Sequence, residues 1–190
     1  MLNLAYKLKD ELIIGSEVYK LNLNFDNVIR LLDMLKSKDL EDYEKLYFAM
    51  FMLTGKPFTK YSIEDVDLFL SQIIDEHIKN EELNSVEYDL AGNPMPAKKN
   101  EEEQERLYSL KYDSDYIFAS FFQAYNIDLI EMQGKLHWKK FNALLGGLPE
   151  NTKFMEVIKI RSYKPSKHDS SEYKEHMRSL QRQYELPTED

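Results

Sequence analysis

The sequence predicts a mainly α-helical protein that combines a short N-terminal β-hairpin, a small multi-helix bundle, a charged connector and a polar C-terminal helix. Apolar residues alternate with polar ones before residue 25 and recur at three- and four-residue spacing after it, which indicates strands followed by helices. Turn residues and a run of glutamates interrupt the helical pattern near the middle. With 190 residues, 43% of them hydrophobic, the chain has enough apolar material for one core with extensions.

The first expected element is the antiparallel hairpin. An apolar run at 12–14 leads into Gly15-Ser16, and Leu21, Leu23 and Phe25 then alternate with polar residues. A glycine followed by a small polar residue suits a two-residue turn, because glycine adopts a positive φ at little cost. We therefore expect two short strands joined at Gly15-Ser16.

Three amphipathic helices are expected to complete the region 1–79. The first begins at Asp26, the second is stopped by Gly55 and Pro57, and the third begins after Ser62, which resembles the start of a capping box with Asp65. The apolar positions are Val28, Ile29, Leu32 and Leu35 in the first helix, Tyr43, Leu46, Tyr47, Met50 and Leu53 in the second, and Ile63, Val66, Leu70, Ile73, Ile74 and His77 in the third.

Residues 80–113 are predicted to be a charged, flexible connector with at most a polar helix near 101–110, because they combine a Gly-Asn-Pro-Met-Pro turn segment with a block of glutamates. Residues 114–165 are expected to form three further helices that pack with residues 1–79. The first of these is apolar around most of its circumference, which predicts a central position, and its N-cap is Ser114 or Asp115. Gly146-Gly147 and Pro165 end the later two.

Residues 166–190 are predicted to be an amphipathic tail. Its apolar stripe is narrow and consists of Tyr173, Met177, Leu180 and Tyr184. Such a stripe either packs on its own domain or docks on a partner, and the sequence favours neither reading. These four residues are the expected partner-binding residues, since the core needs them least.

Composition bears on the class of function. A net charge of -9, with the 25 Lys and Arg scattered among acidic residues, makes nucleic acid a poor partner. The absence of cysteine excludes disulfides and thiolate chemistry. Because no secretion signal and no membrane-spanning apolar run are recognisable, we expect a cytoplasmic protein with no membrane association.

Residues with catalytic or metal-binding potential are few and dispersed. His77, His137, His168 and His176 form no metal-binding pair, and Gly146-Gly147 follow a helix instead of preceding one as in a phosphate loop. No serine nucleophile motif is present. We therefore expect no enzyme activity, no cofactor and no metal. Trp138 and Phe141 are expected to pack inward, with Lys139 and Lys140 in solvent.

Five segments carry a family resemblance: Asp115–Phe121, Ile127–Ile130, Leu136–Phe141, Leu148–Phe154 and Ile160-Arg161. Together they resemble the phage "gene product fifteen" family of long-tailed phages and prophages of Gram-positive bacteria. Two positions depart from the family pattern: Asn126 replaces a frequent glycine, and Lys139 a frequent second tryptophan.

The resemblance implies a tail assembly chaperone. Such a protein binds and solubilises the tape-measure protein, helps to recruit tail-tube subunits built from the major tail protein, and self-associates in many copies. It would act in the cytoplasm of the infected or lysogenic host and be absent from the mature virion. The main alternative is a structural tail or head-completion component that stays in the virion. A hydrolase or metal enzyme and a DNA-binding regulator are less favoured.

Overall fold

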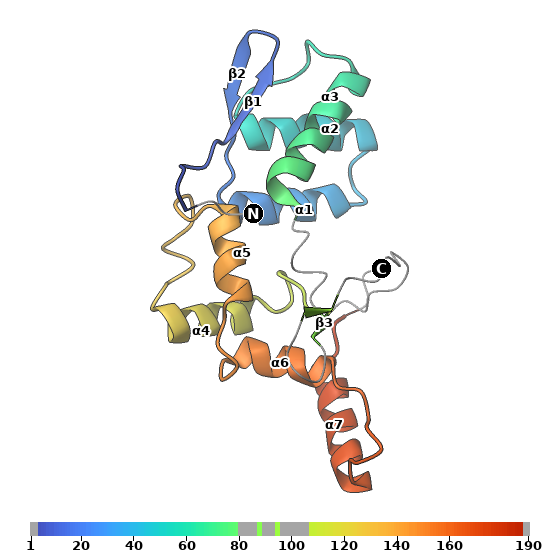
Figure 1. Cartoon of the computed structure of the whole chain (residues 1–190). Helices are drawn as coiled ribbons and strands as arrows, with labels where there is room; N and C mark the ends of the chain where they lie inside the picture. Colours follow the sequence, from blue (N-terminus) through green and yellow to red (C-terminus); the bar gives the residue numbers. More distant parts are fainter. Residues whose placement is uncertain (1–3, 80–86, 89–93, 96–106, 188–190) are drawn as a thin grey trace. The chain divides into compact units, whose positions relative to one another are not determined.

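The computed structural model describes residues 4–79, 87–88, 94–95 and 107–187, and these residues form a mainly helical structure with a short N-terminal hairpin (Figure 1). This architecture confirms the predicted fold class. The chain divides into two compact units. The first unit comprises Met1–Ala97 and Met132–Ala143, and the second comprises Lys98–Glu131 and Leu144–Asp190.

The hairpin of the first unit consists of β1 (Glu11–Ile14) and β2 (Glu17–Lys20), paired antiparallel. Gly15 has a φ of 59°, a left-handed conformation that suits glycine, so the turn forms where the sequence predicts it. Strand alternation places Leu12 and Tyr19 on the buried side and the cross-strand pair Ile13 and Val18 on the exposed side.

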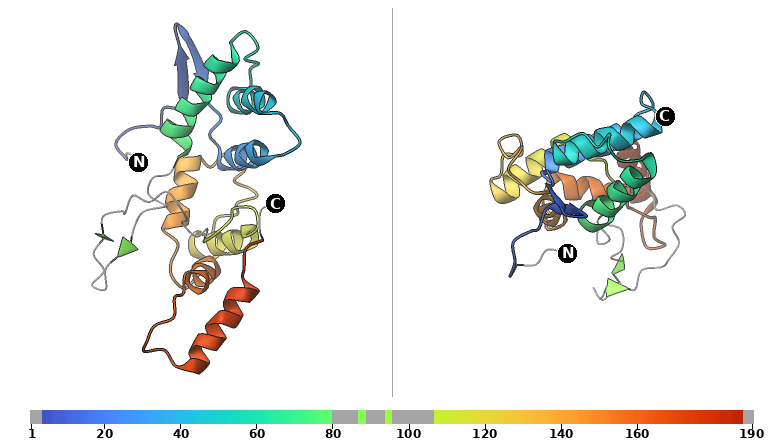
Figure 2. Two further views of the ribbon diagram at one scale, coloured as in Figure 1. Left: turned by 90° about the vertical axis from the view of Figure 1, so that its right-hand side faces the viewer. Right: turned by 90° about the horizontal axis from the view of Figure 1, so that it is seen from above.

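Three helices follow the hairpin: α1 (Phe25–Lys36), α2 (Asp42–Thr54) and α3 (Ile63–Ile73), which continues as the π-helix η1 (Ile74–Ile78). Helix α2 packs against both α1 and α3, as Figures 1 and 2 show. Gly55 ends α2 with a φ of 68°, and the Ser62 side chain accepts a hydrogen bond from the Asp65 N–H. Both local signals therefore act as the sequence predicts.

The inward faces of these helices differ in part from the predicted stripes. In α1, Leu31 is fully buried, while Ile29, Leu32 and Leu35 are half-buried. Helix α2 is apolar on all sides, so periodicity cannot identify its core face, and Tyr43 lies on the solvent side. Ile63 is also exposed, at the first turn of α3.

Residues 132–143 complete the first unit although they come late in the chain. The Trp138 N–H donates to the Leu23 carbonyl at 2.7 Å, and the Phe25 N–H donates to the Leu136 carbonyl at 2.9 Å. The rings of Phe25 and Phe141 stack with centroids 5.0 Å apart. This segment therefore adds apolar side chains to the helices of the first unit.

The second unit contains α4 (Ser114–Tyr125), α6 (Lys153–Arg161) and α7 (Ser171–Gln183), with α6 packed against the other two. Between α4 and α6 in the chain lies α5 (Trp138–Gly146). Helix α4 is not buried all round: Ile117 and Phe121 are buried, but Phe122 is 52% exposed. The prediction of a central position was thus wrong for one side of α4, because an apolar pattern does not distinguish a core face from an exposed apolar face.

The predicted connector falls largely on residues outside those described. Within it the structure places β3 (Glu87–Tyr88) and β4 (Pro94–Met95), which pair antiparallel. At its end, Ser109 and Asp113 are buried. In the described parts of the chain, every helix is too short or too polar to cross a bilayer.

Candidate protein-binding surface

Helix α2 carries aromatic side chains on its solvent side. Four of its thirteen residues are exposed, and three of these are Tyr43, Phe48 and Phe51, with exposed fractions of 51%, 53% and 52%. The opposite side buries Ala49, Met50 and Leu53. Single exposed apolar residues are common, but aromatic residues concentrated on one face are typical of protein interfaces.

The geometry of a helix makes these residues one surface. Tyr43, Tyr47 and Phe51 are four residues apart, so they form a ridge along α2, and Phe48 lies beside Phe51. At about 1.5 Å of rise per residue, this ridge is about 12 Å long. The Tyr47 hydroxyl donates to the Tyr61 carbonyl at 3.1 Å, which fixes its ring against the loop after α2. We call Tyr43, Tyr47, Phe48 and Phe51 the aromatic face.

Glu44 lies on the same side of α2 as the aromatic face, between the directions of Phe48 and Phe51. Its carboxylate accepts a hydrogen bond from the Glu41 N–H at 3.0 Å, which closes the capping box at the start of the helix. Lys45 points away from this side and pairs with Asp42 at 3.3 Å. The aromatic face therefore includes a carboxylate whose position is fixed.

Helix α3 and η1 add negative charge to the same unit. Residues 63–78 contain five acidic side chains and no Lys or Arg. All five, namely Glu64, Asp65, Asp67, Asp75 and Glu76, are exposed. Leu68 is exposed among them, at 65%. This part of the first unit thus favours cationic partners over anionic ones.

A polar cluster fastens the hairpin to the loop after α2. Glu17 accepts hydrogen bonds from Lys60 at 2.7 Å, from Tyr61 at 3.2 Å and from the Tyr19 hydroxyl. The bond from Lys60, followed by that from Tyr19, lowers the pKa of Glu17 to about 2. The bond to Glu17 in turn raises the pKa of Tyr19 to about 12. Because Glu17 is the partner of Lys60, the positive charge of Lys60 is locally balanced.

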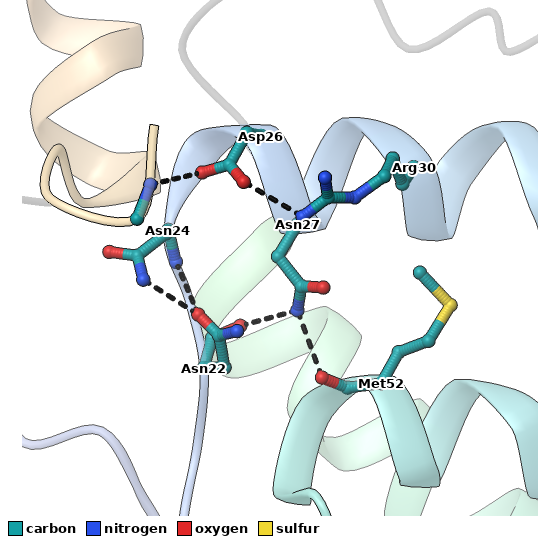
Figure 3. Close-up of polar contacts among 7 residues, drawn as sticks. Asn22, Asn24, Asp26, Asn27, Arg30 and Met52 are labelled. Atoms are coloured by element: carbon teal, nitrogen blue, oxygen red, sulfur yellow. Dashed lines mark hydrogen bonds and ion pairs between the residues drawn. The ribbon is translucent and has the colours of Figure 1, made fainter. Parts of the chain in front are cut away.

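A second cluster holds the C-terminal turn of α2 in place (Figure 3). The buried Asn27 side chain donates to the Asn22 carbonyl at 2.9 Å and to the Met52 carbonyl at 3.0 Å. Beside it, Asp26 accepts from the Gly134 N–H at 2.9 Å and pairs with Arg30 at 2.8 Å. These contacts join α1, α2 and the 132–143 segment, so they hold in position the helix that carries the aromatic face.

The four tail residues predicted to bind a partner lie on or beside α7. Met177 is buried, Leu180 and Tyr184 are half-buried, and Tyr173 is 47% exposed. The Tyr184 hydroxyl accepts a hydrogen bond from Lys153 at 2.9 Å, and the Tyr184 ring packs edge-to-face against that of Tyr116. The Tyr173 ring meets that of Tyr163. In this conformation the stripe packs mainly on its own unit, and its role in partner binding stays a prediction.

The four histidines are divided between the two units. His77 and His137 belong to the first unit and His168 and His176 to the second. The part of the chain that the structure describes holds no group of three or more side chains suited to bind a metal. Burial lowers the pKa of His77. His137 directly precedes α5: its Nδ1 accepts from the Lys139 N–H at 3.0 Å, and its Nε2 lies 3.1 Å from Asp10.

Residues 8–186 match the family model described as Bacteriophage Gp15 protein. The chain belongs to this family. No curated protein and no solved structure matches it.

The segments that carry the Gp15 resemblance build the fold of this chain. Trp138 and Phe141 are buried as predicted, and the Trp138 ring N–H donates to the Ile78 carbonyl at 2.9 Å. Lys139, which stands where a tryptophan is frequent, donates to the Glu76 carbonyl at 2.9 Å near the end of η1. These positions thus serve the interior and the helix ends of the first unit, whereas the aromatic face lies outside the resemblance segments.

Sequence reasoning missed an ion pair that organises the second unit of this Gp15 family chain. Arg161 binds Asp113 through both carboxylate oxygens, at 2.7 and 2.8 Å. It also donates to the Leu107 and Tyr184 carbonyls. Asp113, and not the predicted Ser114 or Asp115, is the N-cap residue of α4. The available signal was Arg161 itself, a charge that directly follows the apolar positions Val157 and Ile160.

Proposed function

We propose that this chain is a phage tail assembly chaperone that binds and solubilises the tape-measure protein and helps to recruit tail-tube subunits. The observation that carries the proposal is the aromatic face of α2, which exposes Tyr43, Phe48 and Phe51 on a helix capped at both ends. Membership of a bacteriophage family supports a phage-associated role for the chain that carries this surface. The chain is proposed to act by binding and not by catalysis.

The physical requirements of the task suit this chain. A tape-measure protein is a long helical chain with apolar faces, which need a cover to remain in solution before the tube assembles around them. The chaperone must offer an apolar surface without aggregating itself. A net charge of -9 opposes self-aggregation while the aromatic face supplies the contact. The expected location is the host cytoplasm, with the major tail protein as a second partner.

The test is co-expression with the tape-measure protein of the same phage, followed by affinity purification and by comparison of the soluble tape-measure fraction with and without this chain. We expect co-purification and a larger soluble fraction. A tape measure that stays insoluble and does not co-purify would contradict the proposal. Mass spectrometry of purified virions then tests the alternative, because a structural tail component is retained in the particle and a chaperone is not.

A further inference from the structure

The aromatic face and the carboxylate of Glu44 within it together define the chemistry of a partner. We propose that the aromatic face binds an amphipathic α-helix that carries Lys or Arg beside its apolar stripe. This inference rests on the proposed function, because it names the class of tape-measure segment that the chaperone holds.

The shape of the surface fits a helix. The ridge Tyr43, Tyr47 and Phe51 follows the four-residue spacing by which the side chains of one helix enter the grooves of another. Its length of about 12 Å corresponds to about two turns of a partner helix. A partner in β-strand conformation would need a free sheet edge for its backbone hydrogen bonds, and α2 uses its own backbone groups within the helix.

The charges around the surface favour a basic partner. Glu44 lies among the aromatic side chains, and the adjoining α3 adds three exposed acids without a Lys or Arg. Two cations of this unit are already paired, Lys45 with Asp42 and Lys60 with Glu17. A Lys or Arg next to the apolar stripe of the incoming helix would meet Glu44, and the surrounding acids would steer its approach.

A second copy of this chain fits the surface less well. In a two-fold contact each α2 packs on the same face of the other, so residues near the middle of the face meet their equivalents. Glu44 lies near that middle, and the two carboxylates would approach each other between two chains that each carry a net charge of -9. Like charges on an interface disfavour the contact.

The first measurement uses fluorescence anisotropy with a labelled synthetic amphipathic helix of about 20 residues, with Leu and Phe on one face and Lys on its flanks. The full-length chain is the titrant. We expect the wild type to bind the peptide saturably. The double variant Phe48→Ser with Phe51→Ser should bind it at least about tenfold more weakly than the wild type, because aromatic anchors dominate interface affinity. Phe122→Ser is the matched control, with the same residue type and the same exposed fraction of 52% as Phe51. Its binding should equal that of the wild type.

The charge requirement is first tested by changing the peptide and leaving the protein unmodified. This test needs no assumption about the folding of a variant. A peptide with Glu in place of each Lys should bind at least about tenfold more weakly, because several pairings become repulsive. Glu44→Gln should weaken binding of the Lys peptide by about two- to fivefold, as expected for the loss of one exposed ion pair. Glutamine retains the capping-box contact, so the helix start is preserved.

Three results would overturn the inference. One is equal affinity of the double variant and the wild type for the Lys peptide. Another is equal affinity of the wild type for the Lys and Glu peptides. In the third, the Lys peptide does not bind, and sedimentation shows a dimer of the wild type that the double variant Phe48→Ser with Phe51→Ser does not form. That result would assign the aromatic face to a second copy of this chain.

Co-expression with the tape-measure protein separates this inference from the proposed function. If wild type and double variant solubilise the tape measure equally, the function stands and the surface is wrong. If the wild type fails to solubilise it but still binds the Lys peptide through the aromatic face, the surface stands and the tape-measure function is wrong. Loss of solubilisation in the double variant, with Phe122→Ser unaffected, supports both.

Discussion

Arg161 and Asp113 form a two-point ion pair that links the end of α6 to the residue before α4. Their side chains are 9% and 1% exposed, so both charges are removed from water. The Arg161 guanidinium also donates to the Leu107 and Tyr184 carbonyls. The pair therefore joins four separate positions of the second unit, including the end of α7.

Asp113→Asn is expected to destabilise the protein by about 3–5 kcal/mol, because it leaves the buried Arg161 cation without a counter-charge. Urea unfolding followed by circular dichroism measures the change. The double variant Asp113→Leu with Arg161→Met removes both charges and should recover much of the loss. Asp115→Asn, at an exposed position in the first turn of α4, is the control. Equal stability of Asp113→Asn and Asp115→Asn would contradict the assignment.

Asn27→Ala is expected to cost about 1–3 kcal/mol, because the Asn22 and Met52 carbonyls each lose a buried hydrogen-bond donor. The fluorescence of Trp138 follows the unfolding, since it is the only tryptophan and is buried in the same unit. Asn24→Ala is the control, because that side chain bonds only to the exposed side chain of Asn22 in the described contacts and its loss should cost about 0.5 kcal/mol or less. A transition unchanged by Asn27→Ala would show that Asn27 does not support α2.

The parts of this fold that the sequence predicts correctly are those set by local signals. Gly15, Gly55 and Ser62 each determine a turn or a helix end through backbone conformation or a nearby hydrogen bond, and all three act where the sequence indicates. Their effect depends only on neighbours within a few residues. The hairpin turn, the end of α2 and the start of α3 follow from such signals.

Contacts between distant residues escaped prediction. Asp113 and Arg161 are 48 residues apart, and nothing near Asp113 distinguishes it from the other acidic residues of the chain. The aromatic face was missed for another reason: α2 is apolar on every side, so Tyr43 and Tyr47 satisfied the spacing of a core stripe as well as Met50 and Leu53 did. Packing alone decided which side faced solvent.

The Glu17 cluster should make stability depend on acidity. Hydrogen bonds from Lys60 and Tyr19 lower the pKa of Glu17 from 4.5 to about 2 in the folded chain. A carboxylate with a lowered pKa stabilises the fold above its unfolded pKa and loses that effect as the pH falls through the folded value. The difference in Tm between wild type and Glu17→Gln should therefore be full above pH 5 and decline to near zero as the pH falls to about 2.

The control for this pH dependence is Glu11→Gln, which changes an exposed glutamate on the other strand of the hairpin. Its difference from the wild type should vary little over the same range. High salt should weaken the Glu17 effect only in part, because hydrogen bonds accompany the ion pair with Lys60. A Tm difference that grows as the pH falls would have the wrong sign and contradict the role of Glu17.

The tail stripe contains two kinds of residue, and substitution should separate them. Met177→Ala removes a buried side chain of α7 and is expected to cost about 2 kcal/mol, with an earlier thermal transition. Tyr173→Ala removes a partly exposed ring and should cost less than about 1 kcal/mol. If the tail also contacts the tape measure, Tyr173→Ala will reduce co-purification at nearly unchanged stability. If only Met177→Ala reduces co-purification, in proportion to its lower stability, the stripe acts through folding of the second unit, and binding is assigned to α2.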